Sequence, residues 1–197
     1  MIERFLRIVR RRFGAWRALA QARATTERRL SSGPVRRVLV VCYGNIYRSP
    51  FVGEYLRLHG PAELEVRTRG FHRVADRPSP ERHVEMSVQF GIDLSAHRSA
   101  IVTADDLEWA DTVILMDRHN WAALVEAGVA REKLLWIGAL SGDGVEIPDP
   151  YTLETSAAER VLESLHRACE NLISRWQPPS AAPAEAVANE AVPGRTP

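Results

Sequence analysis

The sequence predicts a single α/β domain built on a four-stranded parallel sheet with helices on both faces. Short apolar runs rich in β-branched residues alternate with longer segments of helical periodicity. This alternation is typical of parallel sheets, whose strands are buried on both faces and are connected by helices. A length of 197 residues suits one compact domain with tails, and 45% hydrophobic residues is an ordinary content for its core.

Strands and helices are predicted in alternating order along the chain. Strands are predicted over residues 36–42, 63–68, 111–116 and 133–137, and helices over 50–59, 80–90, 119–126 and 153–176. Thr103 is predicted to cap a further helix. In such sheets ligands bind outside the carboxyl ends of the strands. Cys42 ends the first strand, so it is expected at that edge.

Charge is unevenly distributed between the two ends of the chain. Residues 1–37 hold eleven arginines against two glutamates, a net charge of +9, whereas the remainder holds 15 basic and 23 acidic residues, a net charge of −8. Residues 1–34 are therefore predicted to be a basic N-terminal extension, with an amphipathic helix over 3–21 and a break at Ser31–Pro34. The main domain is predicted over 35–176, and a disordered tail rich in Pro and Ala over 177–197.

The role of the extension stays open at this point. It either packs loosely on the body or attaches to an anionic membrane surface or an acidic partner. An arginine-rich organellar presequence is a third interpretation. No apolar run approaches the ~18–20 residues of a membrane span, so we expect a cytoplasmic protein, peripheral to the membrane if the extension binds lipid.

The chain contains only two cysteines, which limits the disulfide and metal sites that it can form. Cys42 and Cys169 are too few for a disulfide framework, which favours a reducing compartment. No Cys/His spacing is typical of a metal site, and all of His59, His72, His83, His119 and His166 are interpreted as surface or structural residues. We therefore expect neither a metal nor another cofactor.

The loop between the first strand and the next helix, residues 42–50, carries the main signal. Its backbone N–H groups and the helix dipole are expected to converge on one anion. Arg48 supplies a planar fork that matches two phosphate oxygens. Gly44 is expected to adopt a backbone angle that a side chain would obstruct, and Asn45 to tolerate left-handed geometry. The predicted phosphate-binding residues are Tyr43, Gly44, Asn45, Ile46, Tyr47 and Ser49.

Cys42 lies in the same positive field, which favours its thiolate, the form that attacks phosphorus. Ser49 can donate a hydrogen bond to the sulfur. The alternative is a buried, inert cysteine at a strand end. That alternative leaves the combination of Gly44, Asn45, Arg48 and Ser49 unexplained.

Asp149 is the candidate proton donor. It lies between two prolines on a loop after the fourth predicted strand, which places it at the same edge of the sheet. Release of an alkoxide or phenolate needs a proton, which a carboxyl group can supply. An ordinary turn aspartate is the alternative.

These residues together resemble the low-molecular-weight protein tyrosine phosphatase family. Its Cys-x-Gly-Asn-x-x-Arg-Ser-Pro loop is matched at residues 42–50 and its Asp-Pro-Tyr loop at 149–151. The similarity covers about residues 36–176 and leaves both tails outside. The resemblance implies a flavodoxin-like fold of the phosphotyrosine phosphatase I type, so 35–176 is expected to be the phosphatase domain.

The resemblance also implies residue roles. Cys42 is the nucleophile that forms a cysteinyl-phosphate, Arg48 clamps phosphate, and Asp149 is first the general acid and then the general base. Thr68 and His97 match positions that support the phosphate loop. The residues expected to line the substrate pocket are Tyr43, Phe71 and Tyr151.

The implied substrate is phosphotyrosine, or a simple aryl phosphate. The implied partner is a tyrosine-phosphorylated protein, with a bacterial tyrosine kinase as one candidate because bacterial relatives often act on such kinases. No nucleic acid is expected as a partner.

The chain departs from the family at several positions. Tyr47 replaces a second cysteine that many relatives carry, Ala100 a frequent arginine, and Tyr43 is large for its position. Two other classes remain as alternatives. One is an arsenate reductase of the same fold, which needs a relay of cysteines that this chain lacks. The other is a catalytically weak phosphate-binding module whose mouth is crowded by the two tyrosines.

Overall fold

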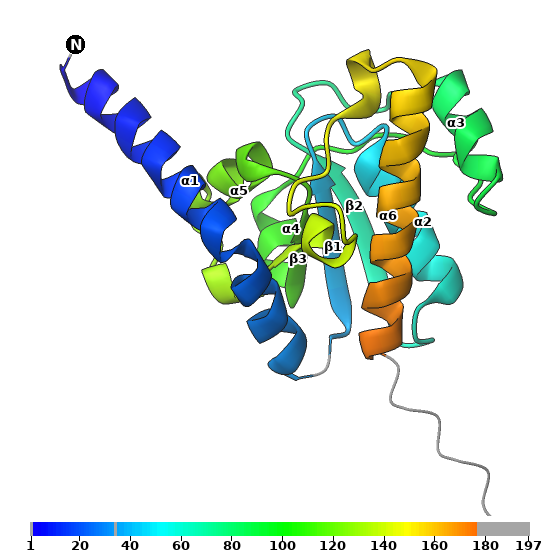
Figure 1. Cartoon of the computed structure of the whole chain (residues 1–197), viewed down its shortest axis with the longest axis horizontal. Helices are drawn as coiled ribbons and strands as arrows, with labels where there is room; N and C mark the ends of the chain where they lie inside the picture. Colours follow the sequence, from blue (N-terminus) through cyan, green and yellow to red (C-terminus); the bar gives the residue numbers. More distant parts are fainter. Residues whose placement is uncertain (1, 34, 177–197) are drawn as a thin grey trace, which may run out of the picture.

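The centre of the molecule is one sheet of four parallel strands. The computed structural model of the protein describes residues 2–33 and 35–176, with burial and contacts for residue 14 and from residue 16 onward. The strands are β1 Arg37–Cys42, β2 Glu65–Gly70, β3 Thr112–Leu115 and β4 Leu134–Trp136. They pair in the order β2-β1-β3-β4 (Figure 1). The predicted four-stranded parallel sheet is confirmed.

Helices connect and cover the strands. They are α1 Ile2–Ser31, α2 Arg48–His59, α3 Glu81–Val88, α4 Ala104–Trp109, α5 Arg118–Glu126 and α6 Thr155–Trp176, with short 3-10 turns η1 Arg131–Lys133, η2 Ile137–Leu140 and η3 Pro150–Thr152. Thr103 caps α4 as predicted, in a capping box with Asp106. After α1, each predicted helix and strand is present with its ends shifted by at most two residues.

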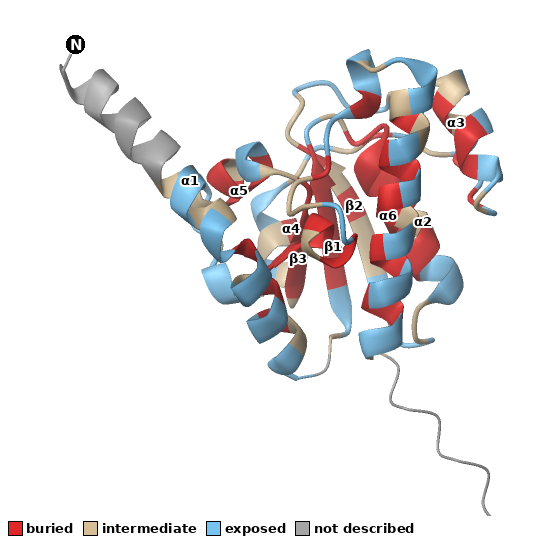
Figure 2. Ribbon diagram, viewed as in Figure 1, coloured by how far each residue is buried: buried red, intermediate tan, exposed pale blue. Residues whose placement is uncertain are grey.

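The sheet separates two layers of helices, and its side chains alternate between them. In β1, Val38, Val40 and Cys42 face a core shared with α2 and α6, whereas Leu39 and Val41 face a core shared with α1 and α5. All five are buried, and β1 is drawn red over most of its length in Figure 2. Burial on both faces explains why the strand lacks polar residues after Arg37.

Helix α1 is longer than predicted and joins the body. The helix predicted over 3–21 continues to Ser31, where the predicted break follows. Its second half packs on the sheet, because Ala22, Thr26 and Arg29 are buried along one face. Thr26 and Arg29 are polar, so hydrophobic periodicity does not mark them as buried. The side chains of the amphipathic pattern at 3–13 lie outside the described part of the chain. The predicted tail 177–197 also lies outside the described residues.

The buried polar residues of α1 form hydrogen bonds with β4, the edge strand, and with its neighbour β3. The Thr26 hydroxyl accepts from the backbone N–H of Trp136 at 3.1 Å, in the edge strand β4. Arg29 donates through Nε to the Thr112 hydroxyl at 2.7 Å. An unpaired strand edge is prone to non-native association, so α1 protects this one by covering it.

The order of the strands determines where the loop after Cys42 lies. After β1 the chain forms β2 on one side and then crosses to form β3 on the other, so the connections diverge at the carboxyl end of β1. Cys42 is the last residue of that strand. Within the described residues, no helix has an apolar stretch long enough to cross a bilayer.

Candidate active site

The sulfur of Cys42 lies among hydrogen-bond donors. The Asn45 backbone N–H points at Sγ from 3.1 Å, and the Ser49 hydroxyl lies 3.1 Å from it on the other side. Asn45 Nδ2 donates to Ser49 Oγ at 2.9 Å, so the serine proton is available for the sulfur. The sulfur is thus held by a donor from the loop backbone and by a hydroxyl from α2.

The loop from Tyr43 to Tyr47 turns its carbonyl groups outward. The Tyr43 carbonyl accepts from the backbone N–H groups at residues 71 and 72, each at 2.9 Å. Arg77 donates to the Gly44 carbonyl. His97 Nε2 lies 2.7 Å from the carbonyl oxygen of Asn45, and His83 Nε2 lies 2.9 Å from that of Tyr47.

Because the peptide unit is planar, the direction of each carbonyl also fixes the direction of the next N–H group. In a trans peptide the carbonyl of one residue and the N–H of the next point in opposite directions. Outward carbonyls at residues 43, 44, 45 and 47 therefore turn the N–H groups of the following residues inward, as the Asn45 N–H to Sγ contact shows. The loop therefore surrounds the cysteine with backbone donors.

Several of these donors are left without acceptors. Within the described part of the chain, the inward-turned backbone N–H groups of Gly44 and Ile46 meet no acceptor. Arg48 Nε is also buried there without a partner. Buried donors are almost always satisfied in proteins. A group of unsatisfied ones around a single point is best explained by an anionic ligand.

Two residues allow the loop to adopt this tight path. Asn45 has the left-handed φ of 50° that was expected of it. Gly70, at the end of β2, lies directly against the loop, because a Cβ there would come within 2.9 Å of the Tyr43 carbonyl oxygen. The expectation for Gly44 is wrong, since its φ is not positive. A Cβ on Gly44 would instead come 3.2 Å from Ile46 Cγ1, so space explains the glycine.

Arg48 is held by two carboxylates beneath the loop. Its two terminal nitrogens contact Asp117 Oδ2 and Asp149 Oδ2, each at 2.7 Å. Nη1 also donates to the Ile147 carbonyl at 2.9 Å. These contacts fix the guanidinium plane, which is almost fully buried, and leave Nε for a ligand. Asp117 caps α5, and no motif in the sequence marked it as a partner of Arg48.

Opposing effects act on the Arg48 charge. Burial tends to lower the pKa of Arg48. The negative charges around it, on Cys42 and then on the two aspartates, outweigh burial, and its pKa lies above the ordinary value. The guanidinium therefore remains a cation in this buried position.

Asp149 lies at the mouth of the site. Its carboxylate caps η3 by accepting from the Tyr151 N–H at 3.3 Å, and Pro150 follows it at the first position of the turn. The side chain is 44% exposed, so it reaches both Arg48 and solvent. The structure thus brings Asp149 to the edge of the sheet where Cys42 lies.

A cavity of about 200 Å³ opens above the loop. Tyr43 and His72 meet edge to face with ring centroids 5.6 Å apart, and Tyr47 and Tyr151 meet in the same way at 6.1 Å. The cavity is lined by Cys42, Tyr43, Gly44, Ile46, Tyr47, His72, Arg77, Asp149 and Tyr151. Its walls are aromatic and its floor carries the cysteine. Within the described chain, no three His, Cys, Asp or Glu residues gather closely enough to hold a metal ion.

Comparison with known proteins decides the family. Residues 37–182 match the family model described as low molecular weight phosphotyrosine protein phosphatase. The chain belongs to this family. Low molecular weight protein-tyrosine-phosphatase Etp of Escherichia coli is 30% identical over 139 residues, which are 70% of this chain and 93% of Etp. The probable phosphatase EpsP of Ralstonia nicotianae is 29% identical over 142 residues, which are 72% of this chain and 96% of EpsP.

Solved structures agree. The tyrosine phosphatase Wzb of Escherichia coli, in complex with sulphate, superposes with a TM-score of 0.67 at 26% identity and covers 73% of this chain and 99% of its own. An arginine phosphatase, YwlE of Geobacillus stearothermophilus, has a TM-score of 0.64 at 24% identity, covers 72% of this chain and 92% of its own, and shares the fold.

One expected pocket residue of this family member lies elsewhere. Phe71 packs beside Val102 and Leu107 in a groove between α4 and α5, on the other face of the sheet from α2. Side chains alternate along an extended strand, so Phe71 follows Arg67 and Arg69 to the α4 face. His72, which was interpreted as a surface or structural residue, lines the pocket in its place.

Of the two residues expected to support the phosphate loop, only His97 contacts the loop directly. His97 holds the Asn45 carbonyl, as described above. Thr68 is buried in β2, and its Cγ2 would be 2.1 Å from a Cβ placed on Gly53 of α2. Thr68 therefore contacts the helix that carries Arg48 rather than the loop itself. Sequence reasoning missed Arg77 and His83, because no local pattern marks residues that reach the loop from α3 or from the segment before it.

Proposed function

We propose that this chain is a protein tyrosine phosphatase that works through a cysteinyl-phosphate on Cys42. The observation that carries the proposal is the ring of unsatisfied, inward-facing donors around the Cys42 sulfur. Three phosphate oxygens would satisfy these N–H groups and Arg48 Nε, and would place phosphorus next to the nucleophile. The donors hold negative charge as it develops, so they also favour the transition state.

The first step forms the bond between Cys42 Sγ and phosphorus. The bond from phosphorus to the tyrosine oxygen breaks, and its electron pair leaves on that oxygen. Asp149 donates the proton that converts the leaving group into a neutral phenol.

The second step restores the enzyme. Asp149, now a carboxylate, takes a proton from a water molecule that attacks phosphorus. The S–P bond breaks, inorganic phosphate leaves, and Cys42 returns as a thiolate. Ser49 and the Asn45 N–H support that leaving thiolate through the contacts they make to the sulfur.

The aromatic walls support phosphotyrosine as the substrate. Tyr43 and His72 form one wall, and Tyr47 and Tyr151 the other. Between such walls a flat ring is in contact on both faces, which a phosphoserine side chain cannot exploit. The names of the relatives Etp and EpsP point to the same substrate class. We further propose that the natural partner is a tyrosine-phosphorylated protein, with a bacterial tyrosine kinase as the first candidate.

An arsenate reductase mechanism lacks support. Such a reaction would need Cys169 as a relay thiol. Cys169 is fully buried in α6, and burial raises the pKa of its thiol. A buried neutral thiol is a poor nucleophile.

A substrate panel tests the proposal. Phosphate release is measured from one peptide carrying phosphotyrosine, phosphoserine or phosphoarginine at the same position, with Cys42→Ser as the control. We expect release from phosphotyrosine alone, and none from the Cys42→Ser protein. Faster release from phosphoserine or phosphoarginine would contradict the substrate assignment. Equal activity of Cys42→Ser would contradict the mechanism.

A further inference from the structure

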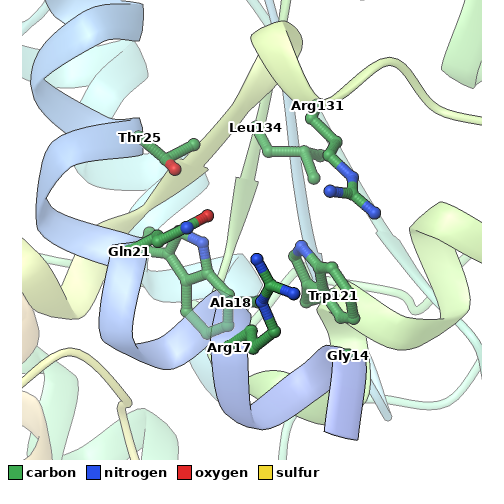
Figure 3. Close-up of a pocket in the computed structure, with 9 residues that line it drawn as sticks. Gly14, Arg17, Ala18, Gln21, Thr25, Trp121, Arg131 and Leu134 are labelled. Atoms are coloured by element: carbon green, nitrogen blue, oxygen red, sulfur yellow. The ribbon is translucent and has the colours of Figure 1, made fainter. Parts of the chain in front are cut away.

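A second cavity, which shares no lining residue with the Cys42 pocket, lies between α1, α5 and the turn before β4 (Figure 3). Its volume is about 350 Å³, which is larger than the catalytic pocket. One wall belongs to α1, which lies outside residues 37–182 that match the family model. The catalytic mechanism uses no residue of this cavity.

Small side chains on α1 keep the cavity open. Gly14 and Ala18 are one turn apart on the face that lines it. A Cβ on Gly14 would come 3.6 Å from the Trp121 ring, so the helix approaches that ring closely. Larger apolar residues at these two positions would fill the space and stabilise the packing of α1. Their absence leaves room for a ligand.

The remaining lining residues of α1 are polar and point into the same space. Arg17, Gln21 and Thr25 follow one another at intervals of four residues, so they form one row along the helix. Figure 3 shows their side chains directed toward the cavity, with Arg131 reaching in from the opposite wall. Arg17 and Gln21 are exposed and Thr25 is half-buried, so this row borders the open side of the cavity. It offers hydrogen-bond donors to a ligand that enters from solvent.

Two arginines, Arg17 and Arg131, line the cavity, and neither is paired with an acidic side chain of the described residues. Within the described part of the chain, neither Arg17 nor Arg131 takes part in an ion pair, and no carboxylate is among the residues that line the cavity. Arg131 lies over the Trp121 ring with 5.7 Å from its guanidinium carbon to the ring centroid. That contact limits the movement of the guanidinium and directs it along the cavity wall.

We propose that this cavity binds a phosphate group that carries an apolar or flat organic portion. The phosphate lies between Arg17 and Arg131, which contact its oxygens through paired N–H groups. The Thr25 hydroxyl and Gln21 amide provide further donors. The organic portion lies against Trp121, one of the two tryptophans that line the cavity. Either a free organic phosphate or the headgroup of an anionic lipid presents this chemistry.

The test uses phenylphosphonate, an aryl phosphonate that the enzyme does not hydrolyse, on the full chain. Binding at the second cavity is followed through the indole N–H resonance of Trp121, assigned with the Trp121→Phe protein. Binding at the catalytic pocket is followed separately as inhibition of aryl phosphate turnover. In Arg17→Gln/Arg131→Gln we expect the indole titration to weaken at least tenfold, with turnover and inhibition unchanged.

Two further variants separate charge from shape. Arg23→Gln/Arg160→Gln removes the same charge from exposed positions that do not line the cavity, and is expected to leave the indole titration unchanged. Ala18→Leu keeps both arginines but fills the cavity, and is expected to abolish the titration. If the Trp121 resonance does not respond to phenylphosphonate, or responds equally in Arg17→Gln/Arg131→Gln, the proposal is wrong.

A vesicle arm identifies the source of the phosphate. Phosphatidylcholine vesicles containing phosphatidic acid are compared with vesicles of matched surface charge that contain phosphatidylserine. Stronger binding to phosphatidic acid that disappears in Arg17→Gln/Arg131→Gln supports a lipid headgroup. An indole titration by phenylphosphonate without any such vesicle preference supports a free organic phosphate. The result of this arm is independent of Cys42 chemistry, so it does not depend on the proposed function.

Discussion

Acidification should destabilise this protein through His83. The ring lies fully buried in α3, with Nε2 2.9 Å from the Tyr47 carbonyl oxygen and 4.5 Å between the His83 and Tyr47 ring centroids. A carbonyl only accepts hydrogen bonds, so Nε2 carries the proton and Nδ1 does not. Nδ1 is buried without a partner in the described structure. Protonating it would place an unsolvated charge behind the phosphate loop.

The sign and size of the effect follow from the pKa of His83. Burial, the largest cause, lowers it from 6.5 to about 4, and the nearby charges of His97 and Arg82 act in the same direction, while the bond to the Tyr47 carbonyl opposes them. Between these values the unfolded chain binds more protons than the folded one. The stabilisation is therefore complete above the unfolded pKa and is lost as pH falls. By about pH 5 the loss is roughly 2 kcal/mol, from ~1.36 kcal/mol for each pH unit.

The assay is urea unfolding of the wild type and His83→Gln at about pH 7.5 and pH 5. Glutamine keeps a donor near the position of Nε2 but does not titrate. Other titrating groups, His97 among them, act in both proteins and cancel in the difference. We expect the wild type to lose roughly 2 kcal/mol more than His83→Gln on acidification. Equal losses in the two proteins would refute the reasoning.

Three other predictions concern the catalytic pocket and its support. Asp149→Asn should slow esters with poor leaving groups by about 10²–10⁴-fold, with a much smaller effect on nitrophenyl phosphate, because only the former need a proton donor. Gly53→Ala should lower the free energy of unfolding by about 1–3 kcal/mol in urea, since its Cβ would lie 2.1 Å from Thr68 Cγ2. Peroxide should inactivate the enzyme with little recovery in dithiothreitol, because Tyr47 cannot form a disulfide with oxidised Cys42.

Each of these three predictions has a control that separates the proposed cause from another explanation. Equal slowing of both ester classes would assign Asp149 a structural role. Thr68→Ser removes the clashing methyl group, so it should restore stability to Gly53→Ala; no restoration would show that the clash is elsewhere. Intact mass after limited peroxide should show two added oxygens, the sulfinic acid. Full return to the unmodified mass with thiol would contradict the oxidation prediction, as would recovery in Tyr47→Cys no greater than in the wild type.

Local sequence patterns were sufficient for the sheet and the loop. The apolar run that ends at Cys42 has to be a buried strand, and the spacing to Arg48 leaves room only for a tight loop before a helix. Asn45 was identified by its tolerance of left-handed geometry, which it adopts. In each case the cause lies within a few residues, so the sequence alone carries the information.

The partners of the loop were not predictable in this way. Asp117 follows β3 and meets Arg48 across 69 positions, and Arg77 reaches Gly44 across 33. No periodicity links such pairs, because they depend on how strands are ordered in the sheet. Phe71 was misplaced for a related reason: alternation along β2 decides its face, and the register of that strand was not known from sequence.

The packing of α1 was missed for a different reason. Thr26 and Arg29 look like solvent-facing residues, yet they satisfy the edge strand and the Thr112 hydroxyl. Hydrophobic patterning detects burial of apolar residues only, so a helix whose buried face mixes Ala22 with polar residues resembles an appendage.

Rapid-quench kinetics on a phosphotyrosine peptide tests the central claim most directly. The account predicts a burst of tyrosine product approaching one equivalent per enzyme, with intact mass showing one phosphoryl group that peptide mapping assigns to Cys42. Cys42→Ser should show neither burst nor cysteine-linked label. Steady turnover from the first cycle with no phosphoryl group on Cys42, or a label that maps to another residue, would contradict the account.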